Sequence, residues 1–414
     1  MKILHVIPSV SPVRGGPSQA VLEMVNALCQ QGIMAEIVTT NDHGPDLLDV
    51  PLQQWVKYPL PASEQSVSAC FFPRFSPKIS AIREFAFSGA FTAWLWQHIS
   101  DYDLVHIHAI FSYPSTIAIV IARLQKVPYI IRPIGQLCEW SLQQGARKKQ
   151  IYLDLVERAN LNHCQFLHLT SEQEQQEVAK LNLNTPNFIL PLGFSFPAPI
   201  SNARQRLRQH LSLPPDEPVI LFLSRLHPKK GLDYLIPALG KLTNHQFTFV
   251  LAGSGAPAYE AQIESLLISN GIRDRTRLTG FVEGETKNLL LQGSDLFALT
   301  SHSENFGVAV LEAMASGLPV LLTPGVALAT EVKQHQLGYV TQLNTSDIAS
   351  TLEEYLTSHQ QAKAMGQRAC QFVRDYYTWD KIAANLIQVY QAITDRQPVS
   401  ALTSYTPLSN KPLA

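Results

Sequence analysis

Short apolar runs alternate with segments of helical period along most of this 414-residue chain. Runs of strand length bounded by turn residues are typical of buried strands, and the segments between them are typical of crossover helices. This alternation predicts an α/β fold in which parallel sheets are built from strand–helix–strand units. The predicted strands are 2–7, 35–39, 104–107, 129–132, 166–169 and 187–190 in the first half, and 219–224, 247–252, 277–279, 296–299 and 319–322 in the second.

The chain is long enough for two large domains, because a domain usually has about 150 residues. Residues 193–202 contain Pro197, Pro199 and no clear period, and they are predicted to link the domains 1–195 and 196–378. Each domain is large enough for one doubly wound sheet. A last helix is predicted over 379–394, and the Ser-, Pro- and Thr-rich residues 395–414 are expected to form a disordered tail.

Charge and cysteine usage narrow the function classes. The 32 basic and 33 acidic residues nearly cancel, so the chain as a whole lacks the excess of positive charge that is typical of a nucleic-acid-binding protein.

The cysteines and the apolar stretches indicate the compartment. Five cysteines without a Cys-x-x-Cys pair fit thiols of a reducing compartment, and the apolar stretch after Lys2 is too short for a signal peptide. Prolines interrupt the long uncharged stretches 104–122 and 313–330, so no spanning helix is expected. A cytoplasmic protein is therefore expected.

A pair of cations follows the strand predicted at 219–224. Arg225 ends that strand, Lys230 comes five residues later, and Gly231 opens a helix. At the carboxyl end of a parallel strand, two fixed cations beside a helix N-terminus can bind a diphosphate. The alternative is that both cations are solvated loop charges.

A second segment repeats this arrangement after the strand predicted at 296–299. Glu304 lies in the loop, and the N–H groups of Phe306, Gly307 and Val308 open the next helix, where they can bind a phosphate. Carboxylates accept hydrogen bonds from sugar hydroxyls, so Glu304 is expected to lie free to hold a sugar and Glu312 to reach the ribose of a nucleotide sugar. The alternatives are a carboxylate favoured by the helix dipole for Glu304, and an exposed helix residue for Glu312.

Together with the run Glu-Ala-Met-Ala-Ser-Gly-Leu-Pro-Val at 312–320, these residues resemble the retaining glycosyltransferase family 4. The resemblance covers most of the chain. It implies the GT-B fold, in which two Rossmann-like domains face each other across a cleft and the helix 379–394 crosses back to the first domain. It also implies transfer of a sugar from a nucleoside diphosphate sugar, which is a substrate, with retention of anomeric configuration, no bound metal and no cofactor.

Three glycine-containing loops extend the resemblance. The first, after strand 2–7, would reach the donor phosphates or the acceptor, although alone it is also an ordinary glycine-rich turn. The second, after strand 247–252, resembles the family's nucleotide loop; it lacks the third glycine of a dinucleotide fingerprint, which disfavours a dehydrogenase. The third loop follows strand 277–279, and its backbone would face the base of the nucleotide. The residues in these loops are Gly15 and Gly16, Gly253 and Gly255, and Phe281 and Val282.

The strand at 104–107 introduces two histidines, His106 and His108, that face the same way. They could suggest zinc, but no third ligand with a familiar spacing lies nearby, so no metal site is predicted. His106 is expected to be a hydrogen-bonded core residue, and the resemblance gives His108 a contact with the transferred sugar. Arg132 also ends a strand and is a candidate for acceptor binding, although Ile134 and Gln136 replace the family's usual His and Met.

The sequence therefore predicts a retaining hexosyltransferase of surface polysaccharide or glycolipid assembly, with His108, Arg225, Lys230 and Glu304 as its catalytic residues. A sugar-nucleotide epimerase or phosphorylase on the same scaffold and a non-catalytic binding module remain alternatives. The partners are the donor and a glycan or lipid-linked acceptor. The basic residues 147–153 and the aromatic-rich stretch 71–96 could touch the inner face of a membrane; the alternatives are a basic helix start and an ordinary core helix.

Overall fold

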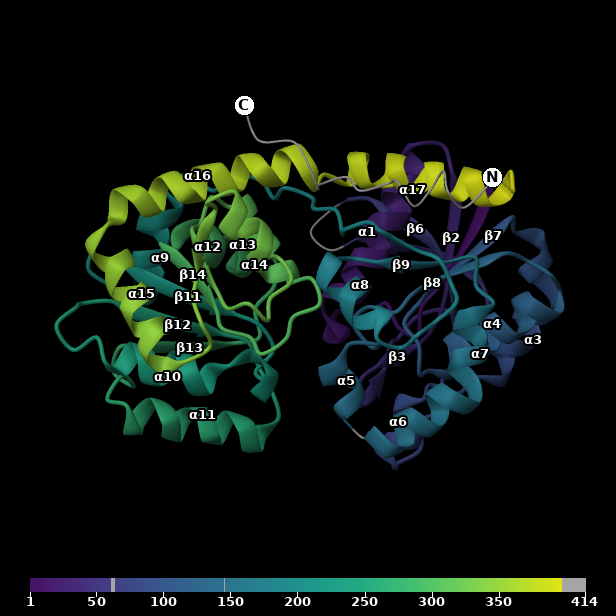
Figure 1. Ribbon diagram of the computed structural model, residues 1–414, viewed down its shortest axis with the longest axis horizontal. Coiled ribbons are helices and arrows are strands. Elements are labelled where there is room, and N and C mark those ends of the chain that lie inside the picture. The colour runs from purple at the N-terminus through teal and green to yellow at the C-terminus, as the bar shows by residue number, and fades with distance from the viewer. Residues whose placement is uncertain (61–63, 145, 397–414) are drawn as a thin grey trace. The chain divides into compact units, whose positions relative to one another are not determined.

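The computed structural model describes residues 1–60, 64–144 and 146–396 (Figure 1). The chain divides into two compact units. Unit 1 is Met1–Gly193 with Thr378–Ala414, and unit 2 is Phe194–Tyr377. From residue 397 on, the predicted tail lies outside the described residues.

Unit 1 is built on an eight-stranded sheet with the order β10-β9-β8-β7-β1-β2-β6-β5. Neighbouring strands are parallel, except that β5 runs antiparallel to β6 at one edge. The strands are β1 (Lys2–Val6), β2 (Met34–Thr40), β5 (Trp55–Pro59), β6 (Ser66–Phe72), β7 (Leu104–His108), β8 (Tyr129–Arg132), β9 (Phe166–Leu169) and β10 (Asn187–Ile189); β3 (Asp42–His43) and β4 (Asp46–Leu47) form a separate hairpin.

Helices cover both faces of this sheet. On one face, α3, α4 and α7 bury apolar side chains against alternate residues of the central strands, such as Val105 and Ile107. On the opposite face, α1 packs against α17. The helices are α1 (Gly16–Gln30), α2 (Ser80–Glu84), α3 (Gly89–His98), α4 (Tyr113–Leu124), α5 (Glu139–Gln143), α6 (Ala146–Tyr152), α7 (Arg158–Asn162), α8 (Glu172–Ala179) and α17 (Trp379–Thr394), with helical turns η1 (Pro12–Arg14), η2 (Ile99–Asp101) and η3 (Leu153–Glu157).

The last helix predicted from the sequence is α17, and it belongs to unit 1. Its Tyr390 hydroxyl lies 2.7 Å from His106 Nδ1 in β7, and its Trp379 indole donates to Glu23 of α1. The backbone of Gly193 approaches Trp379 so closely that a Cβ at Gly193 would lie 2.3 Å from the ring. Helix α17, which follows unit 2 in the chain, therefore completes the first unit.

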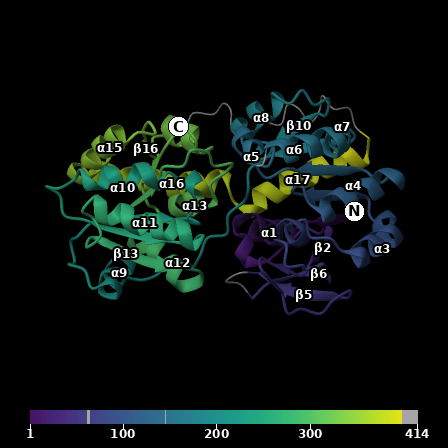
Figure 2. The same ribbon diagram turned by 90° about the horizontal axis from the view of Figure 1, so that it is seen from below.

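Unit 2 contains a six-stranded sheet with the order β13-β12-β11-β14-β15-β16, and all of its pairs are parallel. Helices α10 and α11 lie on one side of this sheet, and α9 and α12 lie on the other (Figure 1 and Figure 2). The elements are β11 (Val219–Leu223), β12 (Thr248–Ala252), β13 (Thr276–Gly280), β14 (Leu296–Leu299), β15 (Val320–Leu322), β16 (Gly338–Val340), α9 (Ala203–Leu211), η4 (Pro228–Lys230), α10 (Leu232–Gly240), α11 (Pro257–Ser269), α12 (Gly284–Gly293), α13 (Val308–Ala315), α14 (Ala329–Gln334), α15 (Thr345–Thr357) and α16 (His359–Tyr376).

Each predicted strand is present, with ends that differ by at most one residue. Five strands were not predicted: β3, β4, β5, β6 and β16. Strand β5 is exposed or half-buried at every position and contains Lys57 and Pro59, so it has no apolar run to detect. The alternative of an ordinary core helix at 71–96 is wrong, because this stretch contains the end of β6, α2 and most of α3. Of the helices in the described part of the chain, none is long and apolar enough to cross a membrane.

Candidate active site

The two charged loops of unit 2 meet at the centre of its sheet. Strands β11 and β14 are neighbours, and from them the strand order runs outward in opposite directions. Such a reversal opens a crevice at the carboxyl ends of the strands, where α/β sheets bind their ligands. The loop after β11 carries Arg225 and Lys230, and the loop after β14 carries Glu304.

Lys230 and Glu304 form an ion pair across this point, with side chains that are 13% and 20% exposed. The expectation that Glu304 lies free is wrong, because neighbouring strands bring the two opposite charges together. Arg225 is exposed and forms no ion pair with the described residues. The structure therefore separates the two predicted cations: one is paired and half-buried, and the other faces solvent.

Backbone contacts fix the loops that carry the pair. The Glu304 N–H donates to the Gly325 carbonyl at 2.7 Å, and the Glu304 carbonyl accepts from the Ala327 N–H at 3.0 Å. Gly231 has a φ of 67°, and a Cβ there would lie 1.9 Å from the carbonyl oxygen of Thr300. Only glycine fits between the two loops at this position.

Helix α13 begins beside Glu304. Gly307 is its N-cap residue, with a φ of 85°, and no side chain caps the helix. The Phe306 side chain is buried, and Val308 is the first helical residue. The helix start therefore offers backbone N–H groups and the positive end of the helix dipole, both of which favour a phosphate.

The loop after β12 lies against the loops after β11 and β13. The Gly253 N–H donates to the Gly280 carbonyl at 2.8 Å, and a Cβ on Gly253 would lie 1.9 Å from the Ser224 carbonyl oxygen. Gly255 forms a parallel bridge with Leu226. The two glycines thus allow close approach of three strand ends. Val282 is half-buried, whereas Phe281, just beyond the end of β13, is 60% exposed, so its ring as well as its backbone is available to a planar base.

Glu312 is buried, which excludes the alternative of an exposed helix residue. Its Oε1 accepts a hydrogen bond from Lys287 Nζ of α12 at 2.8 Å. Lys287 was not among the site residues predicted from the sequence. A charged residue on an amphipathic helix carries no local signal that its partner lies 25 residues away.

In unit 1, Gly15 and Gly16 lie at the start of α1. Gly15 has a φ of 78°, and a Cβ there would meet no atom within 4 Å, so the residue serves backbone conformation rather than close packing. The preceding Arg14 is held by Asp42 at 2.6 Å and by Glu84 at 2.7 Å. The ion pairs of Arg14 therefore hold the turn in place, and no neighbouring atom lies within 4 Å of the space beside Gly15.

Four buried histidines lie on one face of the unit 1 sheet. His168 Nε2 lies 2.8 Å from the Leu190 carbonyl, so it must donate. His168 Nδ1 then accepts from His106 Nε2 at 3.3 Å, and His106 Nδ1 accepts from the Tyr390 hydroxyl. The prediction that His106 is a hydrogen-bonded core residue is confirmed. Beside this chain, His108 Nε2 lies 3.0 Å from His5 Nδ1.

Three of the buried histidines lie close enough together to be considered as ligands of one metal ion. No third ligand with a familiar spacing stands near His106 and His108 in the sequence, but in the structure His5 joins them, with ligand atoms within 4.8 Å of one another. The strand pairing that places His5 beside His106 cannot be read from local spacing. However, both nitrogens of His106 already have partners, so His106 would have to give up one hydrogen bond to bind a metal.

Burial keeps this cluster neutral. Burial, with a smaller effect of nearby Arg132, lowers the pKa of His5 and of His168 to about 3. The pKa values of His106 and His108 are lowered in the same way, chiefly by burial. Although His108 ends its strand as expected, it is fully buried.

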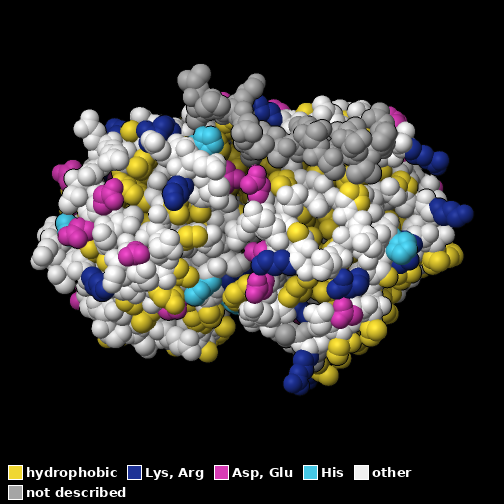
Figure 3. Space-filling model, viewed as in Figure 1, with side chains coloured by type: hydrophobic (Ala, Val, Ile, Leu, Met, Phe, Trp, Pro, Cys, Tyr) yellow, Lys and Arg dark blue, Asp and Glu magenta, His cyan; other side chains and the backbone are white. Residues whose placement is uncertain are grey.

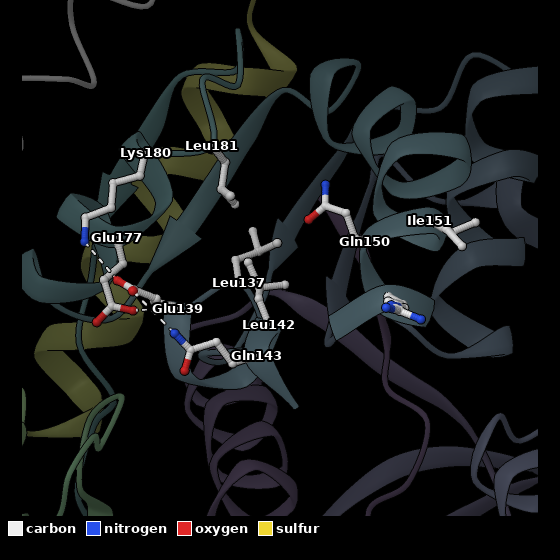
Figure 4. A pocket seen from close by; sticks show the side chains of 10 residues that line it. Leu137, Glu139, Leu142, Gln143, Gln150, Ile151, Glu177, Lys180 and Leu181 are labelled. Carbon is white, nitrogen blue, oxygen red and sulfur yellow. Dashed lines mark hydrogen bonds and ion pairs between the residues drawn. The ribbon is translucent and has the colours of Figure 1, made fainter. Parts of the chain in front are cut away.

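A pocket of about 750 Å³ lies in unit 1 among α5, α6 and α8 (Figure 4). Leu137, Leu142 and Leu181 contribute apolar wall, and Lys180 and Gln143 both reach Glu139 beside it. Helices α5 and α6 follow β8 in the chain, and α8 follows β9. The sequence analysis did not identify it.

Two family models match the chain. Residues 15–193 match "Glycosyl transferase 4-like domain", and residues 203–372 match "Glycosyl transferases group 1". The chain is 33% identical to an uncharacterized glycosyltransferase of Methanocaldococcus jannaschii, over 44% of this chain and 47% of that protein. It is 24% identical to a D-inositol 3-phosphate glycosyltransferase of Jonesia denitrificans, over 94% and 95%. The chain spans about half the length of the first two curated relatives it matches.

The fold is also found in solved structures. Sucrose-phosphate synthase from Thermosynechococcus elongatus matches with a TM-score of 0.77 and 20% identity, over 96% of this chain and all of that one. The Anabaena protein HepE in complex with UDP and glucose matches with a TM-score of 0.73 and 18% identity, over 95% and 100%. These matches confirm the predicted GT-B fold of two Rossmann-like domains. Since the two family models together cover most of the sequence, the chain belongs to the glycosyltransferases of the family 4 type.

Proposed function

We propose that this glycosyltransferase moves a hexose from a nucleoside diphosphate sugar to a glycan or lipid-linked glycan, with retention of anomeric configuration and without a bound metal, in surface polysaccharide or glycolipid assembly. The observation that carries the proposal is the Lys230–Glu304 pair beside the start of α13. A cation and a helix start suit a diphosphate, and a carboxylate suits sugar hydroxyls. The names of a GDP-mannose-dependent mannosyltransferase of Mycobacterium tuberculosis and of HepE with UDP-glucose support a donor of this class.

The proposed reaction is driven by charge stabilisation. As the bond between the anomeric carbon and the phosphate oxygen breaks, its electron pair stays on that oxygen. Lys230, Arg225 and the N–H groups at the start of α13 stabilise the negative charge that develops on this oxygen. The acceptor hydroxyl attacks from the side on which the phosphate leaves, and its proton passes to the departing phosphate. Once the phosphates engage Lys230, Glu304 turns to the hydroxyls of the transferred sugar.

The remaining donor contacts are assigned to the neighbouring loops. Gly253 and Gly255 admit the nucleotide to the strand ends, Phe281 and Val282 face the base, and Glu312 binds the ribose through the oxygen that Lys287 does not hold. In unit 1, the family resemblance assigns Gly15 and Gly16 to the donor phosphates or the acceptor, and His108 to the transferred sugar.

A lipid-linked acceptor and peripheral membrane contact are supported by the surface of unit 1. Hydrophobic side chains gather along the edge of this unit formed by α6, α7 and α3 (Figure 3). Ile151 and Leu155 are exposed there, and Arg147 lies among the residues that line the neighbouring apolar pocket. Exposed apolar side chains beside a cation suit an amphiphile or an anionic bilayer surface.

The donor assignment is tested by thermal unfolding in the presence of UDP, GDP, ADP and dTDP. At least one of them is expected to raise the midpoint, because a ligand that binds only the native state stabilises it by mass action. If none does, the donor site is misassigned. Incubation with the matching labelled sugar nucleotide but no acceptor then separates the alternatives: rapid isomerisation would indicate an epimerase, and binding without transfer to any acceptor would indicate a binding module.

Glu304→Gln and Glu312→Gln are expected to fail in different ways. Glu312→Gln loses a charge-assisted hydrogen bond to the ribose and should weaken nucleoside diphosphate binding by about 1 to 3 kcal/mol. Glu304→Gln should bind the free nucleoside diphosphate almost normally but transfer the sugar poorly. Titration calorimetry beside a transfer assay measures both effects, and the reverse pattern would mean that the two carboxylate roles are exchanged.

A further inference from the structure

Three arginines are buried in the part of the chain that the structure describes. Arg74 pairs with Asp42 and Arg208 pairs with Asp295, and each also donates to backbone carbonyl oxygens. Arg132, at the end of β8, is 1% exposed and forms no ion pair with a described residue. Its Nε and Nη1 also have no hydrogen-bond partner among these residues.

A buried guanidinium without a partner needs an explanation. Taking a charge out of water is costly unless an opposite charge or hydrogen-bond acceptors replace the solvent. The carboxylate that acts on Arg132 from nearby is Glu174, but its oxygens already accept from the N–H groups of Gly135 and Thr170 at 2.8 Å and from the Thr170 hydroxyl at 2.9 Å. Burial lowers the pKa of Arg132 to about 10, so it stays charged at neutral pH.

A second buried nitrogen without a partner lies beside it. His108 pairs in register with Arg132 across β7 and β8, so the two side chains leave the same face of the sheet. His108 Nδ1 is buried without a partner among the described residues. In the tautomer in which His5 Nδ1 donates to His108 Nε2, His108 carries its own proton on Nδ1 and is a second donor without an acceptor.

The backbone after both residues is strained. Ala109 and Phe111, which follow His108, have φ values of 75° and 56°, and Ile134, which follows Arg132, has a φ of 50°. Such values are unfavourable for residues other than glycine, above all for a β-branched one, and they gather at ligand-binding sites.

We propose that Arg132 and His108 bind an anionic group, a phosphate or a carboxylate, at the carboxyl ends of β7 and β8. A guanidinium donates two parallel hydrogen bonds to the oxygens of such a group, and the imidazole N–H adds a third. The inference rests on the proposed function for one point only: if unit 1 holds the acceptor, the anionic group belongs to the acceptor, which is then a phosphorylated or acidic sugar.

The site is tested on the full chain without any nucleotide. Titration calorimetry with inorganic phosphate and, separately, with acetate should detect binding of at least one anion that Arg132→Met weakens at least tenfold. Any phosphate that binds at the donor site contributes equally to both titrations, because wild type and Arg132→Met both keep Lys230 and Arg225. If wild type and Arg132→Met bind both anions equally, the proposal is overturned.

Arg208→Met is the matched control, since it removes a buried arginine that has a carboxylate partner. In chloride buffer, urea unfolding should show Arg132→Met to be at least as stable as wild type and Arg208→Met to be less stable, with anion binding intact in Arg208→Met. Equal destabilisation of both variants with unchanged anion binding would make Arg132 a structural residue. If Arg132→Met does not fold, Arg132→Lys is used: it keeps the charge but loses the planar fork, and unchanged binding in it overturns the proposal.

A hexose 6-phosphate compared with the same hexose identifies the source of the anion. Binding of the phosphorylated sugar that exceeds that of the parent sugar, and that is lost in Arg132→Met, supports an acceptor that carries the group. Equal binding of both sugars overturns the assignment to the acceptor. Failure of all nucleotides to bind would affect only the donor site of unit 2, so the two failures can be told apart.

Discussion

Lys230→Ala is expected to lower the turnover of sugar transfer by about 100- to 1000-fold, the usual loss when one preorganised charge-stabilising group is removed. Lys230 is half-buried at the strand-order reversal of unit 2 and is already held by Glu304. Its charge is therefore in place before the phosphate oxygen becomes negative, and no reorganisation is needed during the reaction. Arg225→Ala is expected to reduce turnover as well. The measurement is kcat at saturating donor and acceptor.

Lys241→Ala is the control for this prediction. Lys241 is also in unit 2, at the end of α10, and donates to the Ser346 hydroxyl at 3.0 Å. The Lys241 variant should keep normal turnover and unfold at nearly the wild-type midpoint, because it loses only an exposed hydrogen bond. Lys230→Ala should also fold, because the Glu304 side chain that loses its partner is still 20% exposed to water. Near-normal turnover of Lys230→Ala would show that this cation takes no part in catalysis.

Unit 1 is expected to lose stability steeply as the pH falls below 6.5. An unfolded histidine has a pKa of 6.5, whereas burial lowers the pKa of His5 and of His168 to about 3. Between these values the unfolded chain binds more protons than the native one, so the contribution is complete above pH 6.5 and is lost on acidification. Each of these two histidines lowers the free energy of unfolding by about 1.4 kcal/mol for every pH unit of acidification, and the two together lower it by about 2.7 kcal/mol per pH unit. His106 and His108 act in the same direction.

Tryptophan fluorescence can follow this transition in unit 1 alone, because all five tryptophans belong to that unit. Urea unfolding at pH 7.5, 6.5 and 5.5 gives the slope. His168→Gln should reduce it by about 1.4 kcal/mol per pH unit. Glu174 opposes the effect, since burial raises its pKa and the native state then takes up the proton first. A free energy of unfolding that does not change between pH 6.5 and 5.5 would contradict the neutral cluster.

The overall fold could be predicted because its information is local. Buried parallel strands such as β11 and β12 are continuous apolar runs, and their alternation with helical segments indicates the α/β class without any tertiary information. Strand β5 lacks this signal, because Lys57 and Pro59 interrupt its apolar residues and each of its positions is exposed or half-buried. The family resemblance rested on the loops around Lys230 and Glu304, where short motifs carry the chemistry.

The amino-acid sequence by itself determined most of the strands, the order in which the two sheets follow each other along the chain, and the residue types at the strand ends. Only the tertiary structure decided which of those residues meet. Lys230 pairs with Glu304 across 74 residues of chain, and His5 lies against His108 across 103. That Glu174 is held by Gly135 and Thr170, and that Arg132 forms no ion pair with a described residue, are likewise properties of the packed unit. The physical reason is that strand order and register set these contacts, and both depend on the packing of the whole sheet rather than on local periodicity.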